Sequence, residues 1–240
     1  TLPDITAYTQ ENGAKITGSV LNAGSYSKAG DFWIGAYESG FQLNEENLYG
    51  VLYPAGTKEL KAAGPYELTS LAPSVNYDLY LAVYKMFDNG TYFVVVRDSK
   101  LNVASGAGNI NLSYNSEGGA ITGKITDYDG KPILGAYATL KDRTTDNYCG
   151  LATTDQNGAY IFYNIAQGEY ILKGSHSLYA VSTVVNVNVN DGAGFSAADI
   201  LMSATAMPPE IKPVIPDITS DEDTQKAYDL TQHETDPFDS

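Results

Sequence analysis

Aspartates placed two residues apart are the residues of this chain that come closest to a known chemical pattern. Asp127 and Asp129 stand in the run Asp-Tyr-Asp-Gly, where alternating acids precede a glycine. Calcium takes six to eight oxygen ligands, and an EF-hand loop also needs a distant bidentate glutamate, which this run lacks. A calcium ligand pair and a solvated turn therefore both stay open.

A second group of acids lies near the C-terminal end, where acidic residues from 220 to 240 far outnumber the lone Lys226. Calcium would offset the repulsion between this segment and an acidic body. The alternative is a solvated charge run that aids solubility. No cofactor is required on either interpretation. The ligands predicted for an optional calcium ion are Asp127, Asp129, Asp221, Asp223, Asp236 and Asp239.

The sequence contains few of the residue patterns that nucleophilic catalysis or metal binding requires. The chain has two histidines, His176 and His233, and no Gly-x-Ser-x-Gly turn, no zinc-ligand spacing and no P-loop lysine. Cys149 is predicted to be a buried small hydrophobe in or beside a strand. Paired carboxylates are abundant, but a glycosidase cleft normally needs a larger scaffold. The sequence predicts a protein that is not an enzyme.

Charge and hydropathy narrow the class of partner. The 240 residues carry a net charge of -15, which disfavours binding to nucleic acid or to an anionic membrane surface. No apolar stretch approaches the length of a membrane span, so no membrane insertion is expected. The chain begins at Thr1 rather than Met, as a chain that has lost a leader or a piece of a longer chain would.

The strand patterns have a period of two. In the run from Val184 to Asn190, alternate valines face one side and asparagines the other, as in a half-buried antiparallel strand. The run from Phe93 to Val96 is short and rich in β-branched residues, and so predicts a strand that crosses the core. Turn dipeptides such as Asn89-Gly90 and Asp129-Gly130 supply positive φ for tight hairpins. These patterns indicate an all-β sandwich protein.

Internal repetition divides the chain. The run from Gly13 to Val20 is echoed from Gly119 to Thr126, and Gly64–Leu71 matches Gly158–Ile165, in the same order along the chain. We therefore expect two tandem modules of one fold. The predicted segments are an N-terminal extended segment at 1–9, sandwich modules at 10–114 and 115–204, and a Pro-rich acidic C-terminal tail at 205–240.

The tail has features of a segment that docks. Four prolines within residues 207–216 favour extended backbone. The run Leu2 to Thr6 recurs as Ile215 to Thr219, which is either chance, a shared linker, or a sign that the second run occupies a related place on a neighbouring copy. The apolar residues expected to anchor the tail are Ile215, Ile218, Tyr228 and Leu230.

Tyrosines and glycosylation sequons are the residues that could interact with carbohydrate. Tyr77 and Tyr80 differ by three positions, so they face opposite sides of one strand. Exposed tyrosines would stack on a carbohydrate, whereas buried ones fill a sandwich core, and the core interpretation is favoured. Asn89 and Asn111 stand in glycosylation sequons, the first in a predicted turn and the second in a predicted strand.

The second module resembles a known family. Gly123 to Leu140, then Thr154 to Tyr160 and Asn164 to Tyr170, are similar in order to carboxypeptidase regulatory-like domains, over about residues 117–204. The resemblance implies a transthyretin-like or immunoglobulin-like Greek-key sandwich that is non-catalytic as a rule. The related collagen-adhesin B-type repeats can carry a Lys–Asn or Lys–Asp isopeptide bond, but the strand around Lys173 lacks the acid that would promote it.

The sequence therefore predicts an extracellular, non-catalytic structural protein at a cell surface. We expect copies of the chain to assemble head-to-tail into a fibre or array, with the tail of one copy donated to or docked on the next. The alternative is a carbohydrate-binding or spacer module of a larger secreted enzyme or adhesin.

Overall fold

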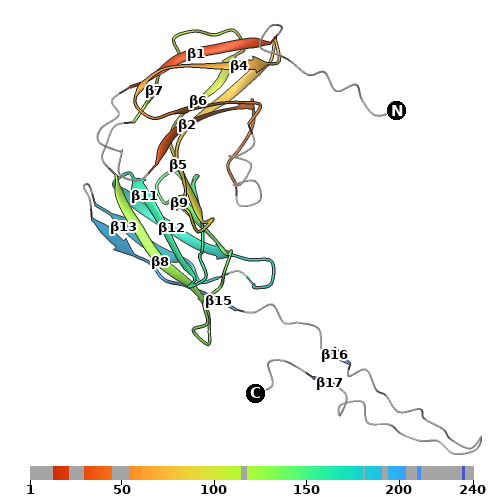
Figure 1. Cartoon of the computed structure of the whole chain (residues 1–240), viewed down its shortest axis with the longest axis vertical. Helices are drawn as coiled ribbons and strands as arrows, with labels where there is room; N and C mark the ends of the chain where they lie inside the picture. Colours follow the sequence, from red (N-terminus) through yellow and green to blue (C-terminus); the bar gives the residue numbers. More distant parts are fainter. Residues whose placement is uncertain are drawn as a thin grey trace, which may run out of the picture. The chain divides into compact units, whose positions relative to one another are not determined.

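The structure is a computed structural model that describes residues 13–21, 30–44, 54–114, 118–180, 182–190, 194–203, 210–211 and 234–235. Every regular element in these ranges is a β-strand, which confirms the all-β class. The chain divides into two compact units, Thr1–Ser203 and Ala204–Ser240. The first unit holds two sandwiches (Figure 1).

The first sandwich has one sheet in the order β4-β1-β7 and, facing it, strands in the order β3-β2-β5-β6. β1 pairs antiparallel with β4 and parallel with the short β7. The strands are β1 (Ala14–Leu21), β2 (Asp31–Glu38), β3 (Gly56–Leu60), β4 (Gly64–Leu71), β5 (Asn76–Met86), β6 (Tyr92–Ala104) and β7 (Leu112–Ser113).

The second sandwich is drawn in green to blue in Figure 1 and repeats this plan. One sheet has the order β11-β8-β14, with β15 also paired to β8, and the other has the order β10-β9-β12-β13. The strands are β8 (Gly119–Asp127), β9 (Tyr137–Asp142), β10 (Tyr148–Thr153), β11 (Ala159–Ile165), β12 (Gly168–Ser175), β13 (Val185–Val189), β14 (Phe195–Ala197) and β15 (Ile200–Met202).

The sequence repeat is a repeat of topology. The order β3-β2-β5-β6 in the first sandwich matches β10-β9-β12-β13 in the second, strand for strand along the chain. β1 and β4 likewise match β8 and β11, and each pair is antiparallel. The prediction of two copies of one fold in tandem is confirmed.

One repeated contact explains the repeated sequence in the first sandwich. Gly18 lies opposite Tyr66 in the β1–β4 ladder. A Cβ on Gly18 would lie 1.7 Å from the carbonyl oxygen of Ile110, so only glycine lets this crossing segment approach. The same carbonyl accepts a hydrogen bond of 2.6 Å from the Tyr66 hydroxyl.

The second sandwich contains the same contact. Gly123 lies opposite Tyr160, and a Cβ on Gly123 would lie 1.8 Å from the carbonyl oxygen of Ala198. That carbonyl accepts a short hydrogen bond from the Tyr160 hydroxyl. The glycine and the tyrosine of the repeat therefore clamp the chain as it returns to its sheet in both modules.

A bulge also repeats. Ser70 near the end of β4 has φ of 63°, and Asn164, its match near the end of β11, has φ of 59°. The ladders shift register beside both residues. Left-handed backbone at matching positions bends both strands at the same place.

Alternating burial builds a core that is continuous through both sandwiches. Val187 and Val189 are buried while Asn186 and Asn188 are exposed, as the period-two pattern predicted. The core cluster contains Phe32, Leu68 and Tyr77 from the first sandwich, and it extends through the second. Tyr77 faces this core, whereas Tyr80 faces the other side of the sheet.

The tail contains two described strands, β16 (Glu210–Ile211) and β17 (Glu234–Thr235), which pair antiparallel. The predicted N-terminal segment at 1–9 lies outside the described residues, and so do the tail anchors Ile215, Ile218, Tyr228 and Leu230. Their docking stays a prediction.

Candidate functional site

The junction of the two sandwiches is a β-ladder. β6 of the first pairs antiparallel with β10 of the second, with Val95 opposite Gly150 and Phe93 opposite Ala152. The two four-stranded layers thereby form one eight-stranded sheet. Backbone pairing and the shared core make the sandwiches one body, an arrangement that the expectation of two separate modules did not include.

Arg97 on β6 secures this junction. Its guanidinium donates a 2.8 Å hydrogen bond to the carbonyl oxygen of Asn164 in the second sandwich. It also lies 4.8 Å from the ring centre of Tyr114 in the first sandwich. Burial lowers the pKa of Arg97 from its usual value. The side chain therefore bridges the modules through a hydrogen bond and a cation–π contact.

Beside the junction lies a groove of about 890 Å³ with acidic and aromatic walls. Its carboxylates already bind backbone: Asp78 accepts hydrogen bonds from the amides of Gly40 and Asn102, and Asp142 from those of Thr144 and Thr145. A carboxylate that caps a turn in this way has few lone pairs left for a ligand. The carboxylates of Asp78 and Asp142 in this groove therefore hold loops in place.

The predicted calcium pair occupies a turn of this kind. Asp127 accepts hydrogen bonds from the backbone amides of Asp129, at 3.0 Å, and Lys131, at 2.8 Å. Asp129 forms an exposed ion pair with the Lys131 ammonium at 3.6 Å. Within the described ranges no three His, Cys, Asp or Glu side chains gather where they would hold a metal. Asp221, Asp223, Asp236 and Asp239 lie outside those ranges.

The two sequons fall on exposed residues. Asn89 lies in the turn after β5, as expected, and its side chain accepts hydrogen bonds from the amide and hydroxyl of Thr91. Asn111 immediately precedes β7 rather than lying within a strand, and its side chain accepts a 3.2 Å bond from the Ser19 amide. Glycosylation at either site stays a prediction.

Cys149 and His176 have structural surroundings. Burial raises the pKa of the Cys149 thiol to about 12, so the thiol stays protonated and is a poor nucleophile. Its sulfur lies 3.6 Å from the Leu140 carbonyl oxygen in the neighbouring strand. The ring of His176 packs edge-on against Tyr179 and accepts a bond from the Leu178 amide. Cys149 lies in β10, as the sequence predicted, but the residue is only partly buried.

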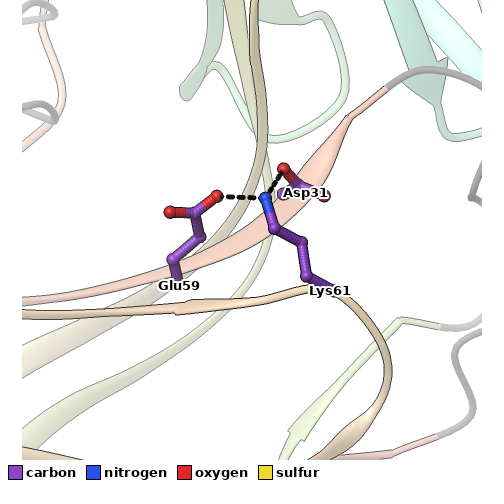
Figure 2. A network of polar contacts seen from close by, with 3 residues as sticks. All are labelled: Asp31, Glu59 and Lys61. Carbon is purple, nitrogen blue, oxygen red and sulfur yellow. Dashed lines mark hydrogen bonds and ion pairs between the residues drawn. The ribbon is translucent and has the colours of Figure 1, made fainter.

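A cluster of charged side chains lies at the β3 end of the sheet. Figure 2 shows the Lys61 ammonium between the carboxylates of Asp31 and Glu59, and the Glu59 contact measures 2.7 Å. The hydrogen bond from Lys61 to Asp31 raises the lysine pKa further above its usual value. The two contacts of the exposed Lys61 ammonium make this cluster an ion-pair network.

Aromatic side chains line the face of the sheet that points away from the main core. Trp33, Tyr84, Tyr92 and Tyr137 are partly buried there around Ala82, Val94 and Leu151. Tyr80 packs edge-on against Tyr37 and Phe41, and its hydroxyl donates a 3.0 Å bond to the Phe41 carbonyl. Tyr77 and Tyr80 are both buried, as the core interpretation predicted.

The eight-stranded sheet has two unlike ends. β3 carries the exposed side chains Lys58 and Glu59, beside the Lys61 cluster. β13 reads Val-Asn-Val-Asn-Val and has no charge. Its outer edge pairs with no strand among the described residues. Charged side chains are a common protection of a sheet edge, and β13 lacks that protection.

The sequence did not indicate the junction residues. Arg97 follows the valine run at the start of β6 and is followed in the same strand by Asp98 and Lys100, so it formed no motif of its own. The edge position of β13 depends on strand order, which a repeat of short strands does not specify. No helix in the described residues is long and apolar enough to cross a membrane.

These features define a protein whose described residues form two fused β-sandwiches. Residues 120–203 match the family model of the carboxypeptidase regulatory-like domain. The resemblance predicted for about residues 117–204 is thereby confirmed for the second sandwich. No curated protein sequence matches the chain.

Solved structures similar to the chain include the shaft pilin SpaA of Lactobacillus rhamnosus GG, at 10% identity and a TM-score of 0.30, covering 82% of this chain and 100% of the pilin. The Streptococcal ancillary pilin is 11% identical, with coverages of 81% and 70% and a TM-score of 0.32. Hydroxyquinol 1,2-dioxygenase from Pseudomonas putida DLL-E4 is 9% identical, with a TM-score of 0.29, over 38% of this chain and 58% of the enzyme.

The Bacillus anthracis TIE protein is 14% identical with a TM-score of 0.34, and the match covers 80% of this chain but 34% of that protein. The match therefore spans less than two thirds of the dioxygenase and about a third of the TIE protein. All these similarities are too distant to assign a function.

Proposed function

We propose that the chain is a non-catalytic extracellular structural subunit whose copies join head-to-tail through the C-terminal tail into a fibre or surface array. The observation that carries the proposal is the eight-stranded sheet, which runs through both sandwiches and ends in an uncharged strand edge. A fused sheet keeps a fixed spacing between its two ends, which a subunit of a regular fibre needs.

The polar chemistry of the described residues supports a structural role. The carboxylates of Asp78, Asp127 and Asp142 hold turns, the thiol of Cys149 is buried, and Arg97 joins the modules. None of these groups is left poised for proton transfer or nucleophilic attack.

The tail is the segment proposed to link copies. It forms a compact unit of its own from Ala204 to Ser240. A contact between unlike surfaces, the tail of one copy and the body of the next, produces an open filament when the rotation does not close. Ile215, Ile218, Tyr228 and Leu230 supply the apolar anchors.

Deletion of residues 206–240 tests the proposal. We expect the full chain to form filaments visible by negative-stain electron microscopy and the truncated chain to remain a folded monomer in analytical ultracentrifugation. Deletion of residues 236–240 alone is the matched control, because it keeps all four anchors. Filaments that persist in the 206–240 deletion would refute the proposal.

The aromatic face favours a second candidate, a carbohydrate-binding role. Trp33, Tyr84 and Tyr92 are partly exposed on one face of neighbouring strands, where sugar rings stack. Titration with soluble polysaccharides while the Trp33 fluorescence is recorded tests this role. A Trp33→Ala variant that binds polysaccharide as well as the wild type would argue against it.

A further inference from the structure

We infer that the outer edge of β13 is the acceptor for the tail of a second copy, specifically for the segment 214–218. This inference rests on the proposed function, which requires a tail contact but does not say where the tail binds.

The internal repeat supplies a precedent for a covered edge. β6 and β13 hold the same place in their sandwiches, each at the end of a matching run of four strands. The outer edge of β6 is covered by β10, through the pairs Val95–Gly150, Val94–Leu151 and Phe93–Ala152. The fold therefore already shows that a strand can pair at this position. At the corresponding edge of β13 no described strand is paired, and the described contact there is the hydrogen bond from the Ser196 hydroxyl of β14.

The backbone of β13 presents its groups outward. The Ser196 hydroxyl donates a 2.7 Å hydrogen bond to the carbonyl of Asn188, so that carbonyl points away from β12. In an antiparallel ladder the N–H and C=O of one residue point to the same side, and alternate residues share that side. The amides and carbonyls of Asn186 and Asn188 therefore face the edge, and each carbonyl retains a lone pair for a donated strand.

The charges of the sheet identify which end accepts. The far end, β3, carries Lys58 and Glu59 beside the Lys61 network, a composition that discourages pairing. β10, the strand that covers β6, has no charged residue. An uncharged segment is thus the expected partner for the uncharged β13, and Val184, which precedes it, is 54% exposed.

The tail contains a segment of this kind. In extended backbone Val214, Pro216 and Ile218 share one face, which would continue the row of buried Val187 and Val189. Pairing through the backbone of Ile215 would turn the nitrogen of Pro216 away from β13, where its missing N–H costs no ladder bond. The same proline would prevent a further strand from adding, so the sheet would end there.

Substitutions at one edge residue of the full chain test the acceptor. Asn188→Pro removes an outward N–H without removing a bond to β12, and Asn188→Ser is the matched control that keeps it. Asn188→Lys adds a charge to the edge and leaves the backbone intact, so it serves if the proline variant misfolds. We expect Asn188→Pro and Asn188→Lys to raise the concentration needed for assembly at least tenfold, and Asn188→Ser to assemble like the wild type.

A complementation experiment tests the occupant. The double substitution Val214→Asp and Ile218→Asp places charges on the donated face while β13 stays intact. At concentrations where the wild type just assembles, we expect each class of variant to be monomeric alone. An equimolar mixture of Asn188→Pro with the tail variant should form dimers and nothing longer, because one intact edge then meets one intact tail.

The outcomes distinguish a wrong acceptor or occupant from a wrong proposed function. If Asn188→Pro and Asn188→Lys assemble like the wild type, β13 is not the acceptor, although tail-dependent assembly stands. If these variants are monomeric while the tail variant still assembles, the occupant is another edge, such as β3 of a second copy, and the tail assignment is overturned. If the wild type itself is monomeric at all concentrations, the proposed function fails as well.

Discussion

Replacing the repeated glycines by alanine tests the clamp that appears in both sandwiches. In Gly18→Ala the new Cβ would lie 1.7 Å from the Ile110 carbonyl oxygen, a backbone atom with no rotamer to change. The crossing segment must move away, and two hydrogen bonds are strained: Tyr66 hydroxyl to Ile110, 2.6 Å, and Ile110 amide to Thr17, 3.0 Å.

The magnitude follows from those losses. Two hydrogen bonds contribute about 1 kcal/mol each, and overpacking adds about 1 to 3 kcal/mol. We therefore expect Gly18→Ala to lower the free energy of unfolding by about 3 to 5 kcal/mol, a large part of the total stability of an ordinary domain. Gly123→Ala should behave alike, because its Cβ would lie 1.8 Å from the Ala198 carbonyl oxygen.

Urea unfolding followed by circular dichroism measures both effects. Gly194→Ala is the matched control, since a Cβ there meets no atom within 4 Å, and we expect a change below about 0.5 kcal/mol. A double-mutant cycle adds detail: Tyr66→Phe should cost less in the Gly18→Ala background, where its bond is already disturbed. If Gly18→Ala unfolds within about 0.5 kcal/mol of the wild type, the clamp does not hold the segment as described.

Three further predictions follow from the same contacts. Arg97→Met should lower the free energy of unfolding by about 2 kcal/mol, because a charged hydrogen bond across the junction is lost. The control is Arg143→Met at an exposed ion pair, which should lower the free energy of unfolding by less than about 1 kcal/mol. Equal effects of the two substitutions would contradict the bridging role of Arg97. Burial raises the pKa of Tyr66 to about 12, so its contribution to stability is complete below pH ~10 and is lost as the pH rises toward 12. Urea unfolding across that range should show less loss in Tyr66→Phe, and an identical pH dependence in both proteins would contradict it. The intact masses of the wild type and Lys61→Ala should differ only by the lysine-to-alanine change, since Lys61 forms ion pairs with Asp31 and Glu59; a wild-type mass lower by one further water would overturn that assignment.

The sequence predicted the fold class and the repeat because both are local. Alternating Val and Asn in β13 predicted a half-buried strand, and the echo of Gly18 and Tyr66 in Gly123 and Tyr160 predicted two copies of one fold. Those residues interact within one module, so their pattern survives in the linear order.

The junction was not predicted because it is a contact between strands far apart in sequence. β6 and β10 pair through neutral residues that would look the same at any sheet edge, and the partner of Arg97 is a backbone carbonyl, which leaves no trace in the sequence. The sequence showed the acidic residues around Asp127. It did not show that backbone amides of the same turn donate hydrogen bonds to the Asp127 carboxylate, because those bonds depend on the conformation of the turn.

The proposed fibre requires the C-terminal tail of one copy to lie on the body of the next. Electron cryo-microscopy of the assembled protein at side-chain resolution would show this contact. We expect density for residues 205–240 packed against a neighbouring subunit. A map in which every tail contacts only its own sandwiches, while the copies touch through other surfaces, would contradict it.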